Sequence, residues 1–534
     1  MEKVFGIDLG TTYSCISYID DSGEPVVLKN AEDGLTTPSV VYFEDENTVI
    51  VGETAKEYAV MHPLQSVSLI KRDMGQEGKY REINGIRMRP EEISARILSK
   101  LVRDATDSLR QKKKLGENEE IKDVVITCPA YFGTAERDAT ENAGKIAGLN
   151  VLAIINEPTA AAINYGVITN ESDKNVLVYD LGGGTFDVTI INITKEQIKV
   201  VVTGGNHVLG GADWDKDVID YVAMCFENET GISGEDLKSN PESLQELTIS
   251  VEKAKKMLTA KPKAPINVNF DGEHMRMELT REKFDELTSD HLQQTIVLTK
   301  DAISEYEKKG YKKSDISEIL LVGGSSKMPQ VKRIVDETFG IPSKLYDPDE
   351  AVSKGASRYA ANIKYYAKLM EEQKEDEILI NPPETNGWGL PGITSIIDVT
   401  SRTYGLEVIG DKIVNFIFKN TELPADLVTK EFGPATDYQS KLRIAIYESL
   451  TGEKEIPLSM GTYVGEATIE LPPNTLTSDK LEIKFHLNNK GLLEMYAREL
   501  KTGNEVNASF DVSGGMSEEE LQQAINRSTG ISVS

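Results

Sequence analysis

Two glycine-rich segments of this sequence share a pattern suited to holding phosphate. FGIDLGTTYSCISYID lies near the N-terminus, and LVYDLGGGTFDVTIINI begins at Leu177. In each, an apolar strand pattern ends in Asp-Leu-Gly and a second alternating pattern follows, which predicts a β-hairpin whose turn exposes backbone N–H groups. Because a strand rather than a helix follows the glycines, the segments are neither a Walker P-loop nor a Rossmann turn.

An aspartate ends the first predicted strand of each hairpin. Asp8 and Asp180 occupy matching positions, so the pair of hairpins predicts a duplicated α/β domain with a nucleotide in the cleft between its halves. Two facing carboxylates repel each other unless a cation lies between them, and Mg²⁺ is commonly shared between carboxylates and nucleotide phosphates. Either hairpin alone could be a tight turn without a ligand, and either aspartate alone could cap a turn. The presence of two matching hairpins favours a nucleotide site over both of these explanations.

A third loop, LLVGGSSKMP, follows another apolar strand pattern. Gly323 and Gly324 would let the backbone approach a flat adenine or ribose closely, although a plain strand-to-helix turn explains them equally well. Glu157, in IINEPTAAA, precedes a proline that suits the first turn of a helix, where carboxylates are common. Only the neighbouring hairpins make Glu157 a candidate ligand of an attacking water.

The secondary structure that positions these residues can be predicted from alternating strand and helix patterns. Strand patterns such as DVVITCPA alternate with helical ones such as PEEISARILSKLVRDATDSL, which is typical of an α/β domain. Residues 369–392 are rich in acids, prolines and glycines and predict a linker or an exposed insertion. Short alternating runs then predict an all-β sandwich. Ser517 and Glu520 form a capping box, which predicts a short helix ending near Arg527.

Composition narrows the class of protein. The 534 residues predict several compact units, and a net charge of -28 argues against a nucleic-acid partner. Five scattered histidines and three distant cysteines argue against a histidine metal centre and a disulfide framework. The sequence shows neither a signal-peptide pattern nor a run of about 18 apolar residues. We therefore expect a cytoplasmic protein that does not bind membranes.

These motifs resemble, in the same order, the nucleotide-binding domain of the seventy-kilodalton heat-shock chaperones of the bacterial DnaK type. The similarity covers about residues 3–363 and rests on IDLGTT, INEPTAAA, DLGGGTFD, LGGADWD, LVGGSSKMPQV and DPDEAVSKGA. The later part resembles the peptide-binding sandwich of this family through DVTSRTYGLEV, FKNTELP, FGPATDYQS and NNKGLLEMYARELKTG. The resemblance implies an actin-like duplicated α/β ATPase domain over residues 1–365, a linker or insertion over 366–393, a β-sandwich substrate-binding domain over 394–512, and a short helical stub of a lid over 513–534.

The resemblance also implies roles for individual residues. Asp8 and Asp180 would hold the waters of Mg²⁺, and Lys71 would hold the attacking water and the γ-phosphate, with Glu157 and Asp187 completing the acid cluster. The phosphates would be held by Gly10, Thr11, Thr12, Gly182, Gly183, Gly184 and Thr185, of which Thr185 would also take part in catalysis. The adenosine pocket of ATP or ADP would comprise Glu252, Lys255, Thr259, Gly323, Gly324, Ser325, Lys327 and Asp349. Without the resemblance, Lys71 would be interpreted as a solvated lysine.

Several positions depart from the family pattern. Lys327 stands where the family usually has an arginine, and a lysine cannot stack on adenine as a planar guanidinium does, which predicts weaker nucleotide binding. Thr259 replaces a usual serine but keeps the hydroxyl. The leucine-rich linker of the family appears here as TSII before Asp398, and Ala153 replaces an arginine that helps to engage the J-domain co-chaperone. Both changes argue against standard stimulation by a J-domain protein.

The resemblance further assigns coupling between the domains to Pro129, Arg137 and Asp398. It assigns an apolar peptide groove and its arch to Leu406, Ile409, Phe432, Ala435, Leu442 and Ile444, although sandwich core explains any one of them equally well. The family's lid is missing beyond its first short helix, so a bound peptide should leave quickly.

Three functions follow as hypotheses. The first is a chaperone that hydrolyses ATP slowly and couples nucleotide state to the binding of extended apolar peptides, with a J-domain protein and a nucleotide-exchange factor as implied partners. The second is a nucleotide-dependent binding module with weak hydrolysis and a specialised client, which the altered linker and absent lid favour. The third is a small-molecule kinase of the same superfamily, which fits poorly because a kinase needs no peptide-groove domain.

Overall fold

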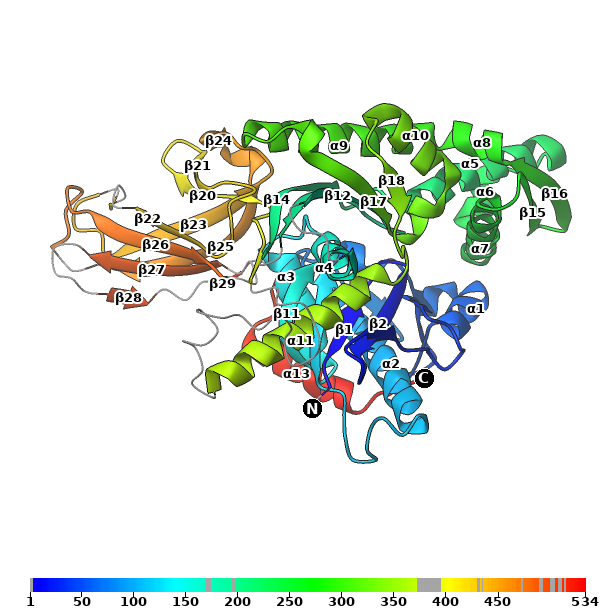
Figure 1. The fold of residues 1–534 in the computed structure, drawn as a ribbon, viewed down its shortest axis with the longest axis horizontal. Helices are drawn as coiled ribbons and strands as arrows, with labels where there is room; N and C mark the ends of the chain where they lie inside the picture. The colour runs from blue at the N-terminus through cyan, green and yellow to red at the C-terminus, as the bar shows by residue number, and fades with distance from the viewer. Residues whose placement is uncertain are drawn as a thin grey trace.

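The computed structural model describes residues 3–169, 174–194, 197–371, 395–429, 433–434, 436–471, 474–488, 493–499, 505–507, 511–512 and 515–534. Two α/β halves form one body, and a β-sandwich lies against one side of it (Figure 1). The last helix, α13 (Glu518–Thr529), lies along the first half of the α/β body, below the sandwich in the view of Figure 1.

The two halves share one strand pattern. The first sheet has the order β11 (Asn150–Asn156), β10 (Asp123–Cys128), β1 (Phe5–Asp8), β2 (Tyr13–Ile19) and β3 (Pro25–Val27), with β4 (Thr37–Pro38) also paired to β2. The second has the order β18 (Ser343–Leu345), β17 (Ile316–Val322), β12 (Lys174–Leu181), β13 (Phe186–Ile193), β14 (Gln197–Asn206) and β19 (Ser395–Ile397). In each half the glycine hairpin is antiparallel and its first strand lies parallel to a later strand, β10 or β17. The predicted duplicated, actin-like α/β domain is confirmed.

Two helices, α4 (Glu157–Thr169) and α11 (Ala351–Glu371), join the halves through a shared apolar core. They approach each other and the first sheet so closely that side chains would not fit. A Cβ on Gly355 would lie 1.7 Å from the Ala160 oxygen, and a Cβ on Gly6 would lie 2.1 Å from the Ser357 nitrogen. This contact fixes the first hairpin relative to the second, because α11 packs against β1, β2 and α4.

Smaller units flank these sheets. On the first half these are β5 (Val41–Phe43), β6 (Thr48–Val51), β7 (Ser66–Val67), β8 (Arg81–Ile83), β9 (Ile86–Met88), α1 (Glu53–Met61), α2 (Pro90–Gln111) and α3 (Thr134–Ile146). On the second they are α5 (Gly211–Thr230), α6 (Gly234–Ser239), α7 (Pro241–Leu258), β15 (Lys263–Phe270), β16 (Glu273–Thr280), α8 (Arg281–Leu287), α9 (Ser289–Lys308) and α10 (Pro329–Phe339). Helices α1 and α7 contact each other, so these units meet across the cleft.

The sandwich has two antiparallel sheets around one core. One sheet has the order β24 (Glu455–Pro457), β21 (Lys412–Ile417), β20 (Thr403–Val408), β23 (Lys441–Ser449), β25 (Thr462–Glu470) and β29 (Asp511–Val512). The other has the order β22 (Ala425–Thr429), β26 (Leu481–Leu487), β27 (Leu493–Glu499) and β28 (Glu505–Asn507). Strand β26 shows why alternating sequence runs form a sandwich: its residues alternate between buried and partly exposed, so one face of the strand packs on the core. The predicted all-β sandwich is confirmed.

Both ends of the sandwich continue into strands that pair with the α/β body. At one end, β19 pairs in parallel with β14, with Ile396 opposite Ile198. The sandwich therefore begins after residue 397 rather than at 394, and α11 runs to Glu371, past the predicted boundary at 365. Residues 372–394, most of the predicted insertion, lie outside the described residues. At the other end, the predicted capping box of Ser517 opens α13, which is confirmed, and β30 (Ser532–Val533) pairs with β6. Among the described helices, none is long and apolar enough to span a bilayer.

Candidate active site

A cavity of about 670 Å³ lies between the two glycine hairpins. Most residues predicted to bind a nucleotide line it, namely Asp8, Gly10, Thr11, Thr12, Glu157, Asp180, Gly182, Gly183, Thr185, Glu252, Lys255, Thr259, Gly323, Gly324, Ser325, Lys327 and Asp349. Three others contact the lining instead: Lys71 pairs with Glu157, Gly184 lies against Thr11, and Asp187 is the cross-strand neighbour of Asp180. The structure thus brings residues from distant parts of the sequence to one cavity.

The two hairpin turns face each other at close range. Within the second turn, the Gly182 N–H donates to the Thr185 oxygen at 3.0 Å. A Cβ on Gly183 would lie 2.0 Å from Thr12 Oγ1 of the first turn, and a Cβ on Gly184 would lie 2.3 Å from Thr11 Cγ2. Only glycine fits where the halves meet, so the glycines of the second motif are required by the opposite hairpin as well as by their own turn.

Four carboxylates surround one lysine at the inner end of the cavity. Lys71, with 5% of its surface exposed, forms an ion pair with Glu157. Burial and the charge of Glu157 raise the pKa of Asp8 to about 7. The same two causes raise the pKa values of Asp180 and Asp187 well above the ordinary range. Since one lysine cannot balance four carboxylates, the three aspartates would be fully ionised at neutral pH only with a further cation beside them.

Lys71 lies in a short 3-10 turn, η2 (Ile70–Asp73), which follows Leu69 in the left-handed conformation with φ of 57°. Burial alone would lower the pKa of Lys71, but the Glu157 and Asp8 carboxylates raise it above its ordinary value. The ammonium is therefore charged at neutral pH, within a region that excludes most water. Interpreted from its immediate sequence alone as a solvated lysine, it is in fact one of the most buried charges of the site.

The acid cluster suits a cation that keeps its own waters. Asp187 Oδ1 accepts from the Ala130 N–H at 2.9 Å, but Oδ2 has no hydrogen-bond partner within the described chain. A buried oxygen of this kind costs free energy unless a cation or a water meets it. The described residues contain no group of three or more acids, cysteines or histidines arranged to ligate a metal directly. Mg²⁺ fits this donor set, because it commonly retains several waters beside one or two carboxylates.

The far wall of the cavity is closed by an ion pair across the cleft. Lys56 of α1 pairs with Glu252 of α7, and the Tyr13 hydroxyl donates to the same carboxylate at 3.0 Å. Burial alone would raise the pKa of Glu252, but Lys56 and Lys256 lower it to about 2. Lys56 is not among the predicted residues, because nothing in ETAKEYAVM distinguishes it from a surface lysine.

Lys255 is held by Asp215, which we did not predict as a site residue although it lies in one of the quoted sequence motifs. Its Nζ donates to Asp215 Oδ2 at 2.6 Å and to the Gly211 oxygen at 2.7 Å. Asp215 ends the motif LGGADWD, so the motif itself was the available signal. Both residues line the cavity, so the ion pair fixes the position of Lys255 in its wall.

The third glycine loop closes the cavity beside the acid cluster. Gly323 has φ of 80°, a conformation that favours glycine, and a Cβ there would lie 2.4 Å from Asp180 Oδ1. Lys327 forms an ion pair with Asp349 at the mouth of the cavity, where about two-fifths of each side chain is exposed (41% and 42%). Thr259 caps α7, its hydroxyl donating to the Lys256 oxygen at 2.7 Å.

The predicted coupling residues lie where the sandwich meets the α/β body. Arg137, buried on α3, donates to Asn156 Oδ1, and Asn156 Nδ2 donates to Asp398 Oδ2 at 2.7 Å. Burial raises the pKa of Asp398, which lies directly after β19. Pro129 is buried after β10. Two more hydrogen bonds cross this interface, Thr134 Oγ1 with Tyr404 at 3.1 Å and Ser401 Oγ with the Phe132 oxygen at 2.7 Å.

The four predicted groove residues that the structure describes differ in their exposure. Leu406 and Ile444 are buried in the sandwich core, and Leu442 packs partly against it. Ile409 is 87% exposed. Phe432 and Ala435 lie outside the described residues. Their assignment to a peptide groove therefore stays a prediction.

Ala153 lies on β11, only 8% exposed and packed in the core shared by the two halves. The alanine is thus accounted for by packing. Because Ala153 is buried, its side chain is not exposed for contact with a partner.

A family model described as Hsp70 protein matches residues 4–371 and 392–532 of the chain. The match covers both the α/β body and the sandwich, and it omits only the part of the insertion between its two segments and a few residues at either end.

Proposed function

This chain belongs to the Hsp70 family and is therefore an ATP-dependent chaperone, and we propose that it hydrolyses ATP slowly between its glycine hairpins and couples nucleotide state to the binding and release of extended apolar peptides. One observation carries the proposal for hydrolysis. Two hairpins from opposite halves and an acid cluster around the buried Lys71 border one cavity. This combination can supply the positioning and charge stabilisation that account for most of the catalysis of phosphoryl transfer to water.

Each group of the cavity has a proposed task. Backbone N–H groups of the two hairpins bind the phosphates, and the threonine hydroxyls orient them. Lys71, held by Glu157, orients the attacking water toward the γ-phosphate, and Asp187 completes the polar surroundings of that water. Asp8 and Asp180 would hold Mg²⁺ through its waters, and the ion would neutralise the charge of the phosphates. The adenosine lies against α7 and the third glycine loop.

We expect ATP with Mg²⁺ to bind this chain with measurable heat, and EDTA to weaken that binding strongly. The reason is the excess of carboxylates around Lys71, which repel a triphosphate unless a cation intervenes. Isothermal titration with and without Mg²⁺ tests this, with AMP as the matched ligand that lacks the β- and γ-phosphates. No heat with ATP and Mg²⁺ would contradict the proposal. Binding without any turnover would instead favour a nucleotide-dependent binding module.

We further expect ATP to accelerate peptide release by less than about a hundredfold. In a two-state protein the shift equals the differential contact energy of the two states. The linker strand β19 offers Ile396 and Ile397, two fewer large apolar side chains than a leucine-rich linker, a difference of roughly 3 kcal/mol if both were buried on docking. Stopped-flow release of a fluorescent apolar peptide, with ADP as the reference state, measures the ratio. An acceleration of a hundredfold or more would show that the altered linker has no consequence.

A J-domain protein and a nucleotide-exchange factor are the proposed partners, and the cytoplasm is the proposed compartment. Ala153 argues against the usual contact with a J-domain protein, because its short side chain is packed in the core. We therefore propose that any such stimulation uses other residues.

A further inference from the structure

The turns of the two glycine hairpins are closed in different ways. The second turn closes itself, since the Gly182 N–H donates to the Thr185 oxygen at 3.0 Å. In the first hairpin the last pair of facing residues is Asp8 with Cys15, and residues 9–14 lie beyond it. A connection of this length is not held by its own backbone as a two-residue hairpin turn is. Other contacts must therefore keep the first turn in shape.

Two buried serines hold the first turn at Gly10 through three hydrogen bonds. The Gly10 N–H donates to Ser14 Oγ at 3.1 Å, and the Ser39 hydroxyl donates to the Gly10 oxygen at 2.8 Å. The third bond joins Ser14 Oγ and Ser39 Oγ, which lie 2.9 Å apart. Only 1% of Ser14 and 2% of Ser39 are exposed, so bulk water does not compete for these bonds.

The direction of each bond follows from counting hydrogens. A serine hydroxyl has one hydrogen and a carbonyl oxygen only accepts, so the hydrogen of Ser39 lies on its bond to Gly10. Ser14 must then donate to Ser39, while it accepts from the Gly10 N–H. The three bonds thus run head to tail around a closed ring, which we call the serine ring. Hydrogen bonds in such an arrangement polarise and strengthen one another in a low-dielectric interior.

The serine ring also decides what Ser14 and Ser39 can offer to a ligand. Both residues line the nucleotide cavity, but both hydroxyl hydrogens are committed to the ring. A phosphate oxygen needs a hydrogen-bond donor, so the closed ring has no hydroxyl hydrogen for it. Donors for phosphate must come from backbone N–H groups of the turn and from its threonine hydroxyls. The two serines therefore act on a ligand through the shape of the turn.

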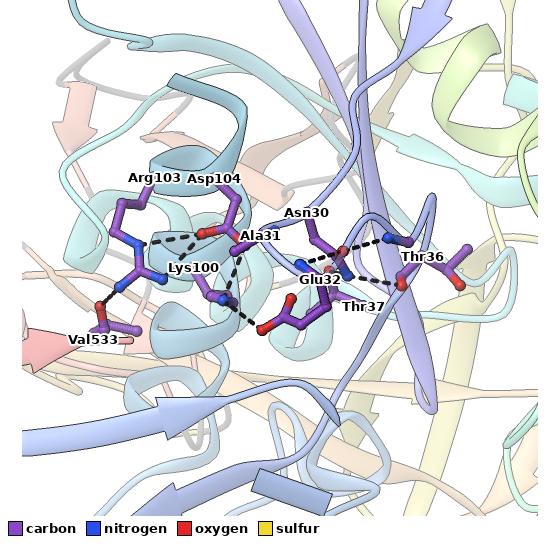
Figure 2. Close-up of polar contacts among 10 residues, drawn as sticks. Asn30, Ala31, Glu32, Thr36, Thr37, Lys100, Arg103, Asp104 and Val533 are labelled. Carbon is purple, nitrogen blue, oxygen red and sulfur yellow. Dashed lines mark hydrogen bonds and ion pairs between the residues drawn. The ribbon is translucent and has the colours of Figure 1, made fainter. Parts of the chain in front are cut away.

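Ser39 reaches the first turn because a distant segment is fixed against it. Its N–H donates to the Thr12 oxygen at 2.8 Å, directly after β4, which pairs with β2. The loop of residues 30–36, which precedes β4, is held by helix α2. Lys100 of that helix, whose side chain is 2% exposed, pairs with Glu32 of the loop at 3.2 Å (Figure 2). Helix α2 thus anchors the segment that carries Ser39.

We propose that Ser14 and Ser39 are positioning residues for ATP hydrolysis: their ring with Gly10 fixes the first turn in the shape that binds the triphosphate. The inference rests on the proposed function, since it requires phosphates to lie against this turn. Neither serine takes part in the reaction itself. Because the ring shapes the turn before the nucleotide arrives, less order has to be imposed on binding.

A double-mutant cycle tests the serine ring. We expect Ser14→Ala and Ser39→Ala each to weaken the binding of ATP with Mg²⁺ about tenfold, because each leaves a backbone group of Gly10 without its partner. The loss in the double variant should stay well below the roughly hundredfold product of two independent changes, since either alanine already opens the ring. Calorimetric titration of the full chain gives all three losses.

Ser17→Ala is the matched control. Ser17 lies on the same strand and is also buried, but its hydroxyl donates to the Ser353 oxygen at 2.8 Å and it does not line the cavity. This change removes one buried hydrogen bond and should leave ATP binding unchanged. Adenosine, which has no phosphate, should bind every variant as it binds the parent chain, and so shows that each is folded. Displacement of a fluorescent ADP derivative measures adenosine binding.

The outcomes separate the two proposals. If ATP with Mg²⁺ does not bind the parent chain, the proposed function is wrong. If it binds, but neither single alanine weakens it more than Ser17→Ala does, or the double variant loses the full product, the serine ring is wrong and the proposed function stands. An equal loss of adenosine affinity also contradicts the ring. A loss that is selective for ATP and less than multiplicative supports it.

Discussion

Replacing Lys71 with alanine is expected to lower kcat for ATP hydrolysis at least about a hundredfold, the size of effect seen when one preorganised charge is removed from a transition state. Lys71 is the buried cation of the described acid cluster, and it forms an ion pair with Glu157. In the proposed mechanism, its loss removes the group that orients the attacking water and stabilises the charge that develops on the γ-phosphate. ATP binding should persist, because the hairpins, α7 and the third glycine loop remain.

The measurement is single-turnover hydrolysis together with calorimetric binding of ATP and Mg²⁺. Lys71→Met, which keeps most of the side-chain volume, separates the charge from the cavity that alanine would create. Lys29→Ala is the matched control, since this lysine is 54% exposed and pairs only with Asp33 of its own loop among the described residues. Unchanged turnover in the alanine and methionine variants would remove Lys71 from the mechanism.

Replacing Asp398 with alanine is expected to lower the ATP-induced acceleration of peptide release by about tenfold or more while leaving basal hydrolysis unchanged. The carboxylate accepts from Asn156 Nδ2 at 2.7 Å and from the Val399 N–H at 2.8 Å, and it lies near the charge of Arg137. Without this carboxylate, Asn156 Nδ2 and the Val399 N–H lose their acceptor where the sandwich contacts the α/β body, at a cost of about 1–3 kcal/mol each. Asp398 does not line the nucleotide cavity, so catalysis should not change directly.

Two further variants sharpen this result. Asp398→Asn keeps a side-chain acceptor and should lose less of the acceleration than alanine, which separates hydrogen bonding from charge. Asp426→Ala is the control, because its partners Lys484 and His486 both belong to the sandwich. If Asp398→Ala behaved like Asp426→Ala in stopped-flow peptide release, the path from Arg137 through Asn156 would not carry coupling.

Local patterns predicted the elements of this protein well, because hydrogen-bond periodicity and turn chemistry act over a few residues. The Asp-Leu-Gly segments predicted both hairpins, and their repetition predicted two related halves. Ser517 and Glu520 predicted the start of α13. The end of the first domain was predicted at residue 365, but α11 continues to Glu371, since nothing in YYAKLME breaks a helix. Pattern suggested Gly323 and Gly324 for the adenosine, whereas family resemblance pointed to Lys71 and the rest of the adenosine pocket.

The tertiary structure alone decided which residues meet. Lys71 lies 86 residues from Glu157 and Lys56 lies 196 residues from Glu252, separations at which a local pattern carries no information. Asn156 bonds to both Arg137 and Asp398 only because folding placed it between them. Strand β30 shows most clearly how far local patterns reach. Residues 532–534 are too few to form a strand by themselves, and they are extended because they pair with the edge of β6. The sequence by itself determined the hairpins, the helices and the kinds of charge available, whereas the pairing of those charges and edges depended on long-range packing that brings distant segments together.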